Sequence, residues 1–99
     1  MDPTRIIHVQ DYSPATLRAV VVQLEGSTSV DHLIYRESEL DALWSLLELE
    51  LRSAQQHGSD THQVHQLQRL CDAAKAAHDC VAAEDPAAAA IRLRQVVEM

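Results

Sequence analysis

The chain has 99 residues, of which 46% are hydrophobic and 23% are charged. This length and composition are typical of a single globular domain over residues 1–99 and exclude fibrous repeats and compositional disorder. Eight basic and 15 acidic side chains give a formal net charge of −7, and only 3% of the residues are aromatic. Nucleic acid is therefore not an expected partner, because phosphate binding needs clustered basic groups and single strands need stacking rings.

The first third of the chain holds three short groups rich in β-branched residues: Arg5–Gln10, Thr16–Leu24 and Val30–Tyr35. Turn-forming residues separate them, and segments and links of these lengths are typical of an antiparallel meander. We therefore predict three strands over residues 5–35.

A helix over residues 14–25 is the alternative for the middle group. Ser13 and Pro14 are suited to the N-cap and first turn of a helix, and the following apolar residues, Leu17, Val20, Val21 and Leu24, have helical spacing. The run of three valines over residues 20–22 favours the strand, because β-branched side chains lose rotamer freedom in a helix.

The remainder of the chain has helical periodicity. One helix is predicted from Ser38 to His57, a second from residues 59–61 to Glu84, and a third over residues 87–97 after Asp85 and Pro86. The link around Gly58 is short, which predicts that the two long helices form an αα-hairpin. The expected fold class is thus α+β: a three-stranded meander, a long helical hairpin and a short C-terminal helix.

The first long helix has apolar side chains on two sides. Leu40 and Leu47 define one stripe, whereas Leu46 and Leu49 point away from it by roughly 100° of rotation or more. Either the predicted sheet covers one side and the helical hairpin the other, or a second subunit covers one of them. Because two-fold dimers are the commonest oligomers, we expect a homodimer formed through this helix.

Acidic residues surround the same helix. Six of the seven net negative charges lie in residues 1–50, and they concentrate at Glu37, Glu39, Asp41, Glu48 and Glu50. Acids at a helix start also favour the helix dipole, so a solvated first turn is the simpler interpretation. The sharper interpretation is an anionic rim that receives a basic protein partner.

A short stretch of this helix resembles a known acidic one. Leu40-Asp41-Ala42-Leu43-Trp44, shortly after Tyr35, is similar to the helix that barstar-family ribonuclease inhibitors present to a basic enzyme. The resemblance is local: Ser45 replaces the acid one turn after Asp41, and the strands that follow the helix in that family are missing. We therefore assign no family, and the resemblance implies only that Asp41, Trp44 and Glu48 would contact a basic toxin or nuclease.

Metal and catalytic motifs are weak. His57, His62 and His65 gather near the interhelical turn, but their spacing matches no zinc motif, and His57 is equally suited to capping a helix. Cys71 and His78 are two turns apart on one helix, too far for a thiolate–imidazole pair. With only two glycines, the chain has no phosphate-binding loop. We expect no enzyme activity and no cofactor, and a histidine-based metal or pH response is the weakest hypothesis.

The cysteines and the hydropathy bear on the compartment. Cys71 and Cys80 fall on opposite faces of one predicted helix, which prevents a mutual disulfide and suits a reducing compartment. No apolar run approaches the roughly 20 residues that span a bilayer. We expect a cytoplasmic protein that interacts with itself or another protein and not with a membrane. The candidate partner-binding residues are Glu37, Asp41, Trp44, Leu46, Glu48, Leu49 and Glu50.

Overall fold

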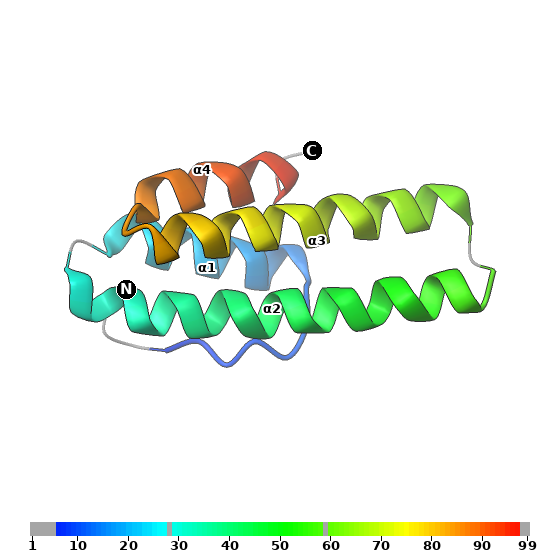
Figure 1. Cartoon of the computed structure of the whole chain (residues 1–99), viewed down its shortest axis with the longest axis horizontal. Helices are drawn as coiled ribbons and strands as arrows, with labels where there is room; N and C mark the ends of the chain where they lie inside the picture. The colour runs from blue at the N-terminus through cyan, green and yellow to red at the C-terminus, as the bar shows by residue number, and fades with distance from the viewer. Residues whose placement is uncertain (1–5, 28, 59, 98–99) are drawn as a thin grey trace.

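The computed structural model describes residues 6–27, 29–58 and 60–97. It contains four α-helices and, among these residues, no strand (Figure 1). The helices are α1 (Pro14–Gly26), α2 (Val30–Gln56), α3 (Thr61–Ala82) and α4 (Pro86–Val97).

The predicted meander over residues 5–35 is wrong, and the helical alternative for residues 14–25 is confirmed. Of the three expected strands, the first lacks regular structure over residues 6–10, and Arg5 lies outside the described residues. The second expected strand lies within α1, and the third forms the first turns of α2.

Local capping and burial explain why the valine-rich segment is helical. The Ser13 hydroxyl accepts a hydrogen bond from the Thr16 backbone N–H at 3.3 Å, and Pro14 occupies the first turn. Val20 and Val21 are buried in the core, whereas Val22 is 49% exposed. Burial of two of the three valines on one helix face outweighs their modest intrinsic preference for strands.

The start of α2 lies eight residues before the predicted one. Ser29 caps the helix by accepting from the Asp31 backbone N–H at 3.2 Å. From there the buried positions recur at steps of three and four through Leu33, Arg36 and Leu40. The helical period was hidden in the sequence because one of these core positions is an arginine.

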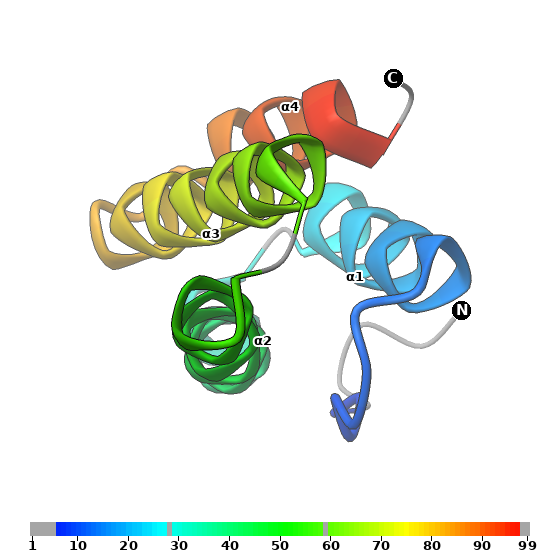
Figure 2. The ribbon, with the colours of Figure 1, turned by 90° about the vertical axis from the view of Figure 1, so that its right-hand side faces the viewer.

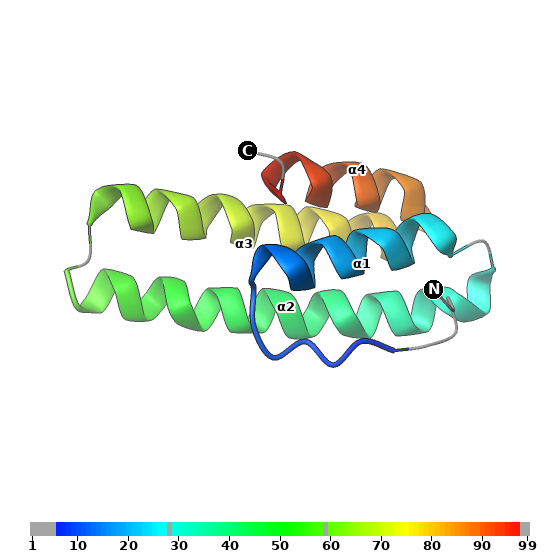
Figure 3. The same cartoon turned by 180° about the vertical axis from the view of Figure 1, so that it is seen from behind.

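The expected αα-hairpin is confirmed by α2 and α3. They run antiparallel and are joined through Gly58, whose φ of +65° suits a residue without a side chain. The second helix was predicted to end at Glu84 and ends at Ala82, and α4 begins at Pro86 after a cap by Asp85. The molecule measures 43 × 23 × 21 Å, and α1 and α4 pack along one half of the hairpin only (Figures 1 and 3).

One apolar core joins the four helices. Its fully enclosed side chains include Leu40, Leu43 and Leu47 of α2 and Leu93 of α4. Residues 6–12 run alongside the first half of α2 and place Ile7, Val9 and Tyr12 against this core (Figure 3). In Figure 2, α1 and α3 lie to one side of α2, and no helix covers its opposite side. Among the described residues, that side of α2 is therefore the one that no other helix covers.

None of the helices over residues 6–27, 29–58 and 60–97 combines the length and the apolar character needed to cross a bilayer.

Candidate interaction surface on α2

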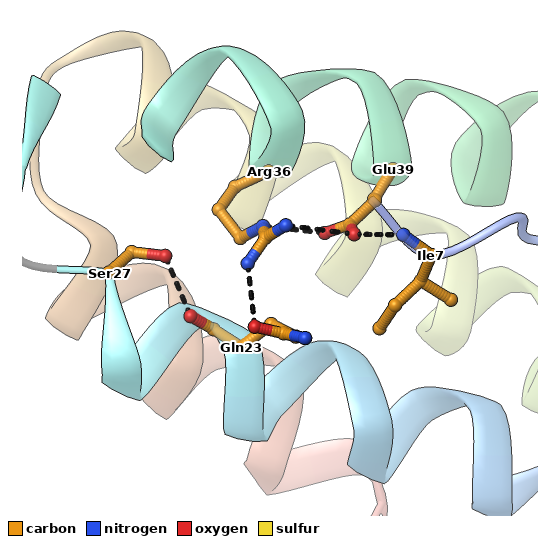
Figure 4. A network of polar contacts seen from close by, with 5 residues as sticks. All are labelled: Ile7, Gln23, Ser27, Arg36 and Glu39. Carbon is orange, nitrogen blue, oxygen red and sulfur yellow. Dashed lines mark hydrogen bonds and ion pairs between the residues drawn. The ribbon is translucent and has the colours of Figure 1, made fainter. Parts of the chain in front are cut away.

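A buried polar network determines which side of α2 faces the core. Arg36 and Glu39 form an ion pair with Nε and Oε1 2.7 Å apart, and both side chains are fully buried (Figure 4). Arg36 also donates to the Gln23 side-chain oxygen on α1 at 2.9 Å, and Glu39 accepts from the Ile7 backbone N–H at 2.6 Å. The network thus attaches both α1 and the N-terminal segment to the inner side of α2.

Burial affects two side chains of this network, Glu39 and Gln23. It raises the pKa of Glu39, although the Ile7 N–H and Arg36 partly counteract the shift. Gln23 is almost fully buried, yet no acceptor for its Nε2 occurs in the part of the chain that the structure describes. A buried network of this kind holds α2 in one rotational setting, because any rotation would leave charges without partners.

The opposite side of α2 carries unusually exposed apolar residues. Val30 is 63% exposed, Ile34 71% and Leu49 68%. Tyr35 is 38% exposed, so α2 carries four of the seven large hydrophobic residues that are exposed in the described chain. Between Ile34 and Leu49 the same side holds small side chains, Ser38, Ala42 and Ser45. We call residues 30, 31, 34, 35, 38, 41, 42, 45, 48, 49 and 52 the outward face of α2.

The leucines of the predicted two-sided pattern lie in three different environments. Leu40 and Leu47 are fully buried, and Leu46 is partly buried. Leu49 alone of this group lies well exposed, on the outward face. Apolar side chains thus remain uncovered on this subunit, but Leu46 contributes less to them than the sequence pattern indicated.

The predicted acidic residues do not form one patch. Glu37, Asp41 and Glu48 are spaced as neighbours along one side of α2, together with Trp44. Glu50 is exposed on a different flank, and Glu39 is buried against Arg36. Glu48 is itself paired with Arg52 at 2.7 Å, an exposed pair that contributes little to stability.

Trp44 of α2 is partly buried and contacts α3. The Lys75 ammonium lies 5.9 Å from its ring centroid, and the ring of His78 lies 6.3 Å away. His78 also approaches Glu37, with Nε2 and Oε1 3.9 Å apart. Burial raises the pKa of the nearby Cys71 thiol, which disfavours the reactive thiolate. These contacts give Trp44 a packing role between the two helices.

The three histidines near the hairpin turn lie in separate settings. His57 is the C-cap residue of α2, and its Nδ1 lies 2.8 Å from the Ser53 carbonyl oxygen that it caps. His62 and His65 are exposed on α3 beside Arg69. Within residues 6–27, 29–58 and 60–97, no three His, Cys, Asp or Glu side chains lie close enough together to hold a metal ion.

A shallow hollow lies within the outward face. It is lined by Ser45, Glu48, Leu49 and Arg52, spaced as one four-residue cell of a helix surface, and has a volume of about 190 Å³. Glu48 and Leu49 were predicted from the sequence, whereas Ile34, Tyr35 and Arg52 of the same face were not. Ile34 and Tyr35 were missed because they were assigned to a strand, and a helix begun at Ser29 would have placed them on the same side as Leu49.

No known protein family matches the chain, and no curated protein or solved structure is significantly similar to it.

Proposed function

We propose that the protein is a non-enzymatic interaction module that associates with a second copy of itself through the outward face of α2. The observation that supports this most directly is the exposure of Ile34 and Leu49, at 71% and 68%, on a helix whose other side is fully engaged. Large apolar side chains gathered on one exposed face are typical of association surfaces. The two cysteines, which form no disulfide, support a reducing, cytoplasmic compartment.

The expected association is weak. Covering an isoleucine or leucine stabilises a complex by about 1.5–3 kcal/mol, and a symmetric dimer covers each residue twice. Joining two molecules costs on the order of 4–15 kcal/mol in lost freedom. The two contributions are of similar size, so the dimer is expected to form only at high protein concentration.

Single substitutions on the outward face test the proposal. We expect the unmodified protein to sediment as a dimer at concentrations of about 100 µM, and Ile34→Asp or Leu49→Asp to sediment as monomers, because a carboxylate in a closed apolar contact loses its hydration. Analytical ultracentrifugation measures this directly, and circular dichroism shows whether each variant remains helical.

Ile91→Asp is the matched control. Ile91 is 56% exposed but lies on α4, away from α2, so this variant should remain dimeric. An unmodified protein that stays monomeric throughout the concentration range contradicts the proposal, as does an Ile34→Asp variant that dimerises normally.

A second candidate function is an inhibitor or immunity-type protein for a basic toxin or nuclease. One observation favours it: Glu37, Asp41 and Glu48 share a side of α2 with the partly buried Trp44. Such binding would weaken steeply with added salt, since it depends on exposed charges. An apolar α2 interface should respond far less, so the salt dependence of any complex distinguishes the two functions.

A further inference from the structure

The outward face of α2 is approximately self-complementary when one copy is reversed. Its centre lies between Asp41 and Ala42, and two pairs of residues equally distant from this point match in size. Ile34 corresponds to Leu49, and Ser38 corresponds to Ser45, so large apolar groups lie at both ends and small ones near the middle. A two-fold axis brings together such equivalent positions of two antiparallel helices. We propose that α2 packs antiparallel against α2 of a second copy, with the axis between Asp41 and Ala42.

The hollow on the outward face receives an apolar side chain in this register. Ile34 of the second copy comes opposite Leu49, above the hollow lined by Ser45, Glu48, Leu49 and Arg52. A side chain inserted among four residues of a facing helix is the knobs-into-holes contact of paired helices. The small Ser38 and Ser45 meet nearer the axis and permit close approach of the two backbones.

One pair of opposite charges on the outward face favours this orientation, whereas the two Asp41 carboxylates lie close together in either orientation and do not distinguish the two. Asp31 comes opposite Arg52 of the second copy, and the symmetry repeats the pair at the other end. The Arg52 side chain is 67% exposed and keeps donors beyond the one bonded to Glu48.

A parallel, in-register pair is disfavoured by the same residues. It would place Asp31 beside Asp31 and Arg52 beside Arg52, and like charges at such contacts repel. It would also stack Ile34 on Ile34 and leave each hollow facing another hollow. The second copy in antiparallel orientation is therefore the occupant that the shape and the charge of this surface specify.

This inference rests on the proposed function, and disulfide trapping tests its register. In a Cys80→Ser background, Ser38→Cys and Ser45→Cys are prepared separately, one carrying a tag that changes its mass. Positions 38 and 45 face each other across the antiparallel pair, whereas the two copies of position 38 lie about 10 Å apart along the direction of the helices. A disulfide needs Cβ atoms about 3.5–4.5 Å apart. After oxidation with oxidised glutathione, the mixed variants should form a cross-linked heterodimer, and each variant alone should remain uncross-linked on a non-reducing gel.

The outcomes separate the register from dimerisation itself. A dimeric protein in which Ser38→Cys cross-links to itself is parallel, which overturns this inference and leaves the proposed function standing. A dimeric protein with no cross-link in the mixture is also incompatible with the proposed register. A protein that sediments as a monomer under the same conditions contradicts both proposals.

Discussion

Arg36 and Glu39 show that a polar residue can occupy a core position without disturbing the helix that carries it. Both side chains are fully buried, and they form the inner side of α2 together with Leu33 and Leu40. A charge is tolerated there because its partner lies one turn away and Gln23 and the Ile7 N–H satisfy further bonds. These polar contacts orient the helix, and that orientation leaves Ile34 and Leu49 facing solvent.

Removing one member of the buried pair should be strongly destabilising. We expect Glu39→Ala to lower the free energy of unfolding by about 3–5 kcal/mol, since Arg36 would remain buried without its counter-charge. Urea denaturation measures this loss. The double variant Arg36→Met/Glu39→Leu should recover most of it, and a double variant as unstable as the single one would contradict this explanation.

The pH dependence of stability provides a control for the same pair. Burial raises the pKa of Glu39 in the folded state above its ordinary value of 4.5, so the folded chain holds this proton more tightly than the unfolded chain does. The resulting stabilisation is complete below pH 4.5 and is lost as the pH rises through the folded-state pKa. Glu39→Gln has no proton to lose there, so the advantage of the unmodified protein over this variant should shrink as the pH rises.

At the scale of elements, residues that cap a helix, together with burial, outweigh the strand preference of single residues. The Ser13 cap and Pro14 begin α1 even though three valines follow, because Val20 and Val21 gain more from burial than they lose in rotamer freedom. Helix ends depend on backbone conformation in the same way. Gly58 has a φ of +65°, and a Cβ added there would meet no atom within 4 Å, so only backbone strain opposes a side chain.

Two glycine substitutions should therefore have opposite signs. Gly58→Ala should destabilise the fold by about 1 kcal/mol, since a left-handed backbone is unfavourable for alanine. Gly26→Ala should stabilise it by about 0.5–1 kcal/mol, because Gly26 is helical and a Cβ there also has open space. Thermal unfolding of both variants checks the pair, and two shifts of the same sign would count against this reasoning.

At the scale of the whole molecule, the hairpin is unevenly supported. We call the half of the hairpin that lies beside α1 and α4 the near half and the half next to the Gly58 turn the far half. In the near half α3 packs against α2 and α4, whereas among the described helices α2 and α3 contact only each other in the far half (Figures 1 and 3). Local opening of the far half therefore breaks fewer contacts. The outward face of α2 spans both halves, so an antiparallel partner would support the far half of one copy with the near half of the other.

Hydrogen exchange should reveal this unevenness. Amides of residues 66–70 in the far half of α3 should exchange faster than those of residues 77–81, although both groups have complete helical hydrogen bonding. Mass spectrometry after deuterium labelling measures the difference. Ile34→Asp, which should prevent dimer formation, provides the comparison for a single copy, and equal protection in both halves of that variant would contradict the uneven support.

The sequence alone was sufficient for the elements with uninterrupted signals. The helical hairpin, the turn at Gly58 and the short last helix follow from local capping and from apolar spacing through leucines and alanines. The candidate site was predicted in part: Leu49, Trp44 and the nearby acids were placed on one long helix. These features depend on residues close together in the chain, and such signals are present in the sequence itself.

Only the tertiary structure shows the features that depend on contacts between residues far apart in the chain. Only the packed chain shows that the valine segment is buried as a helix, that Arg36 lies in the core, and that α2 therefore begins at Val30. The exposure of Ile34 followed from the same contacts, since the ion pair and Gln23 set the rotation of α2. Burial is a property of the assembled molecule, so a surface made of residues that remain uncovered becomes visible only when all the covering elements are in place.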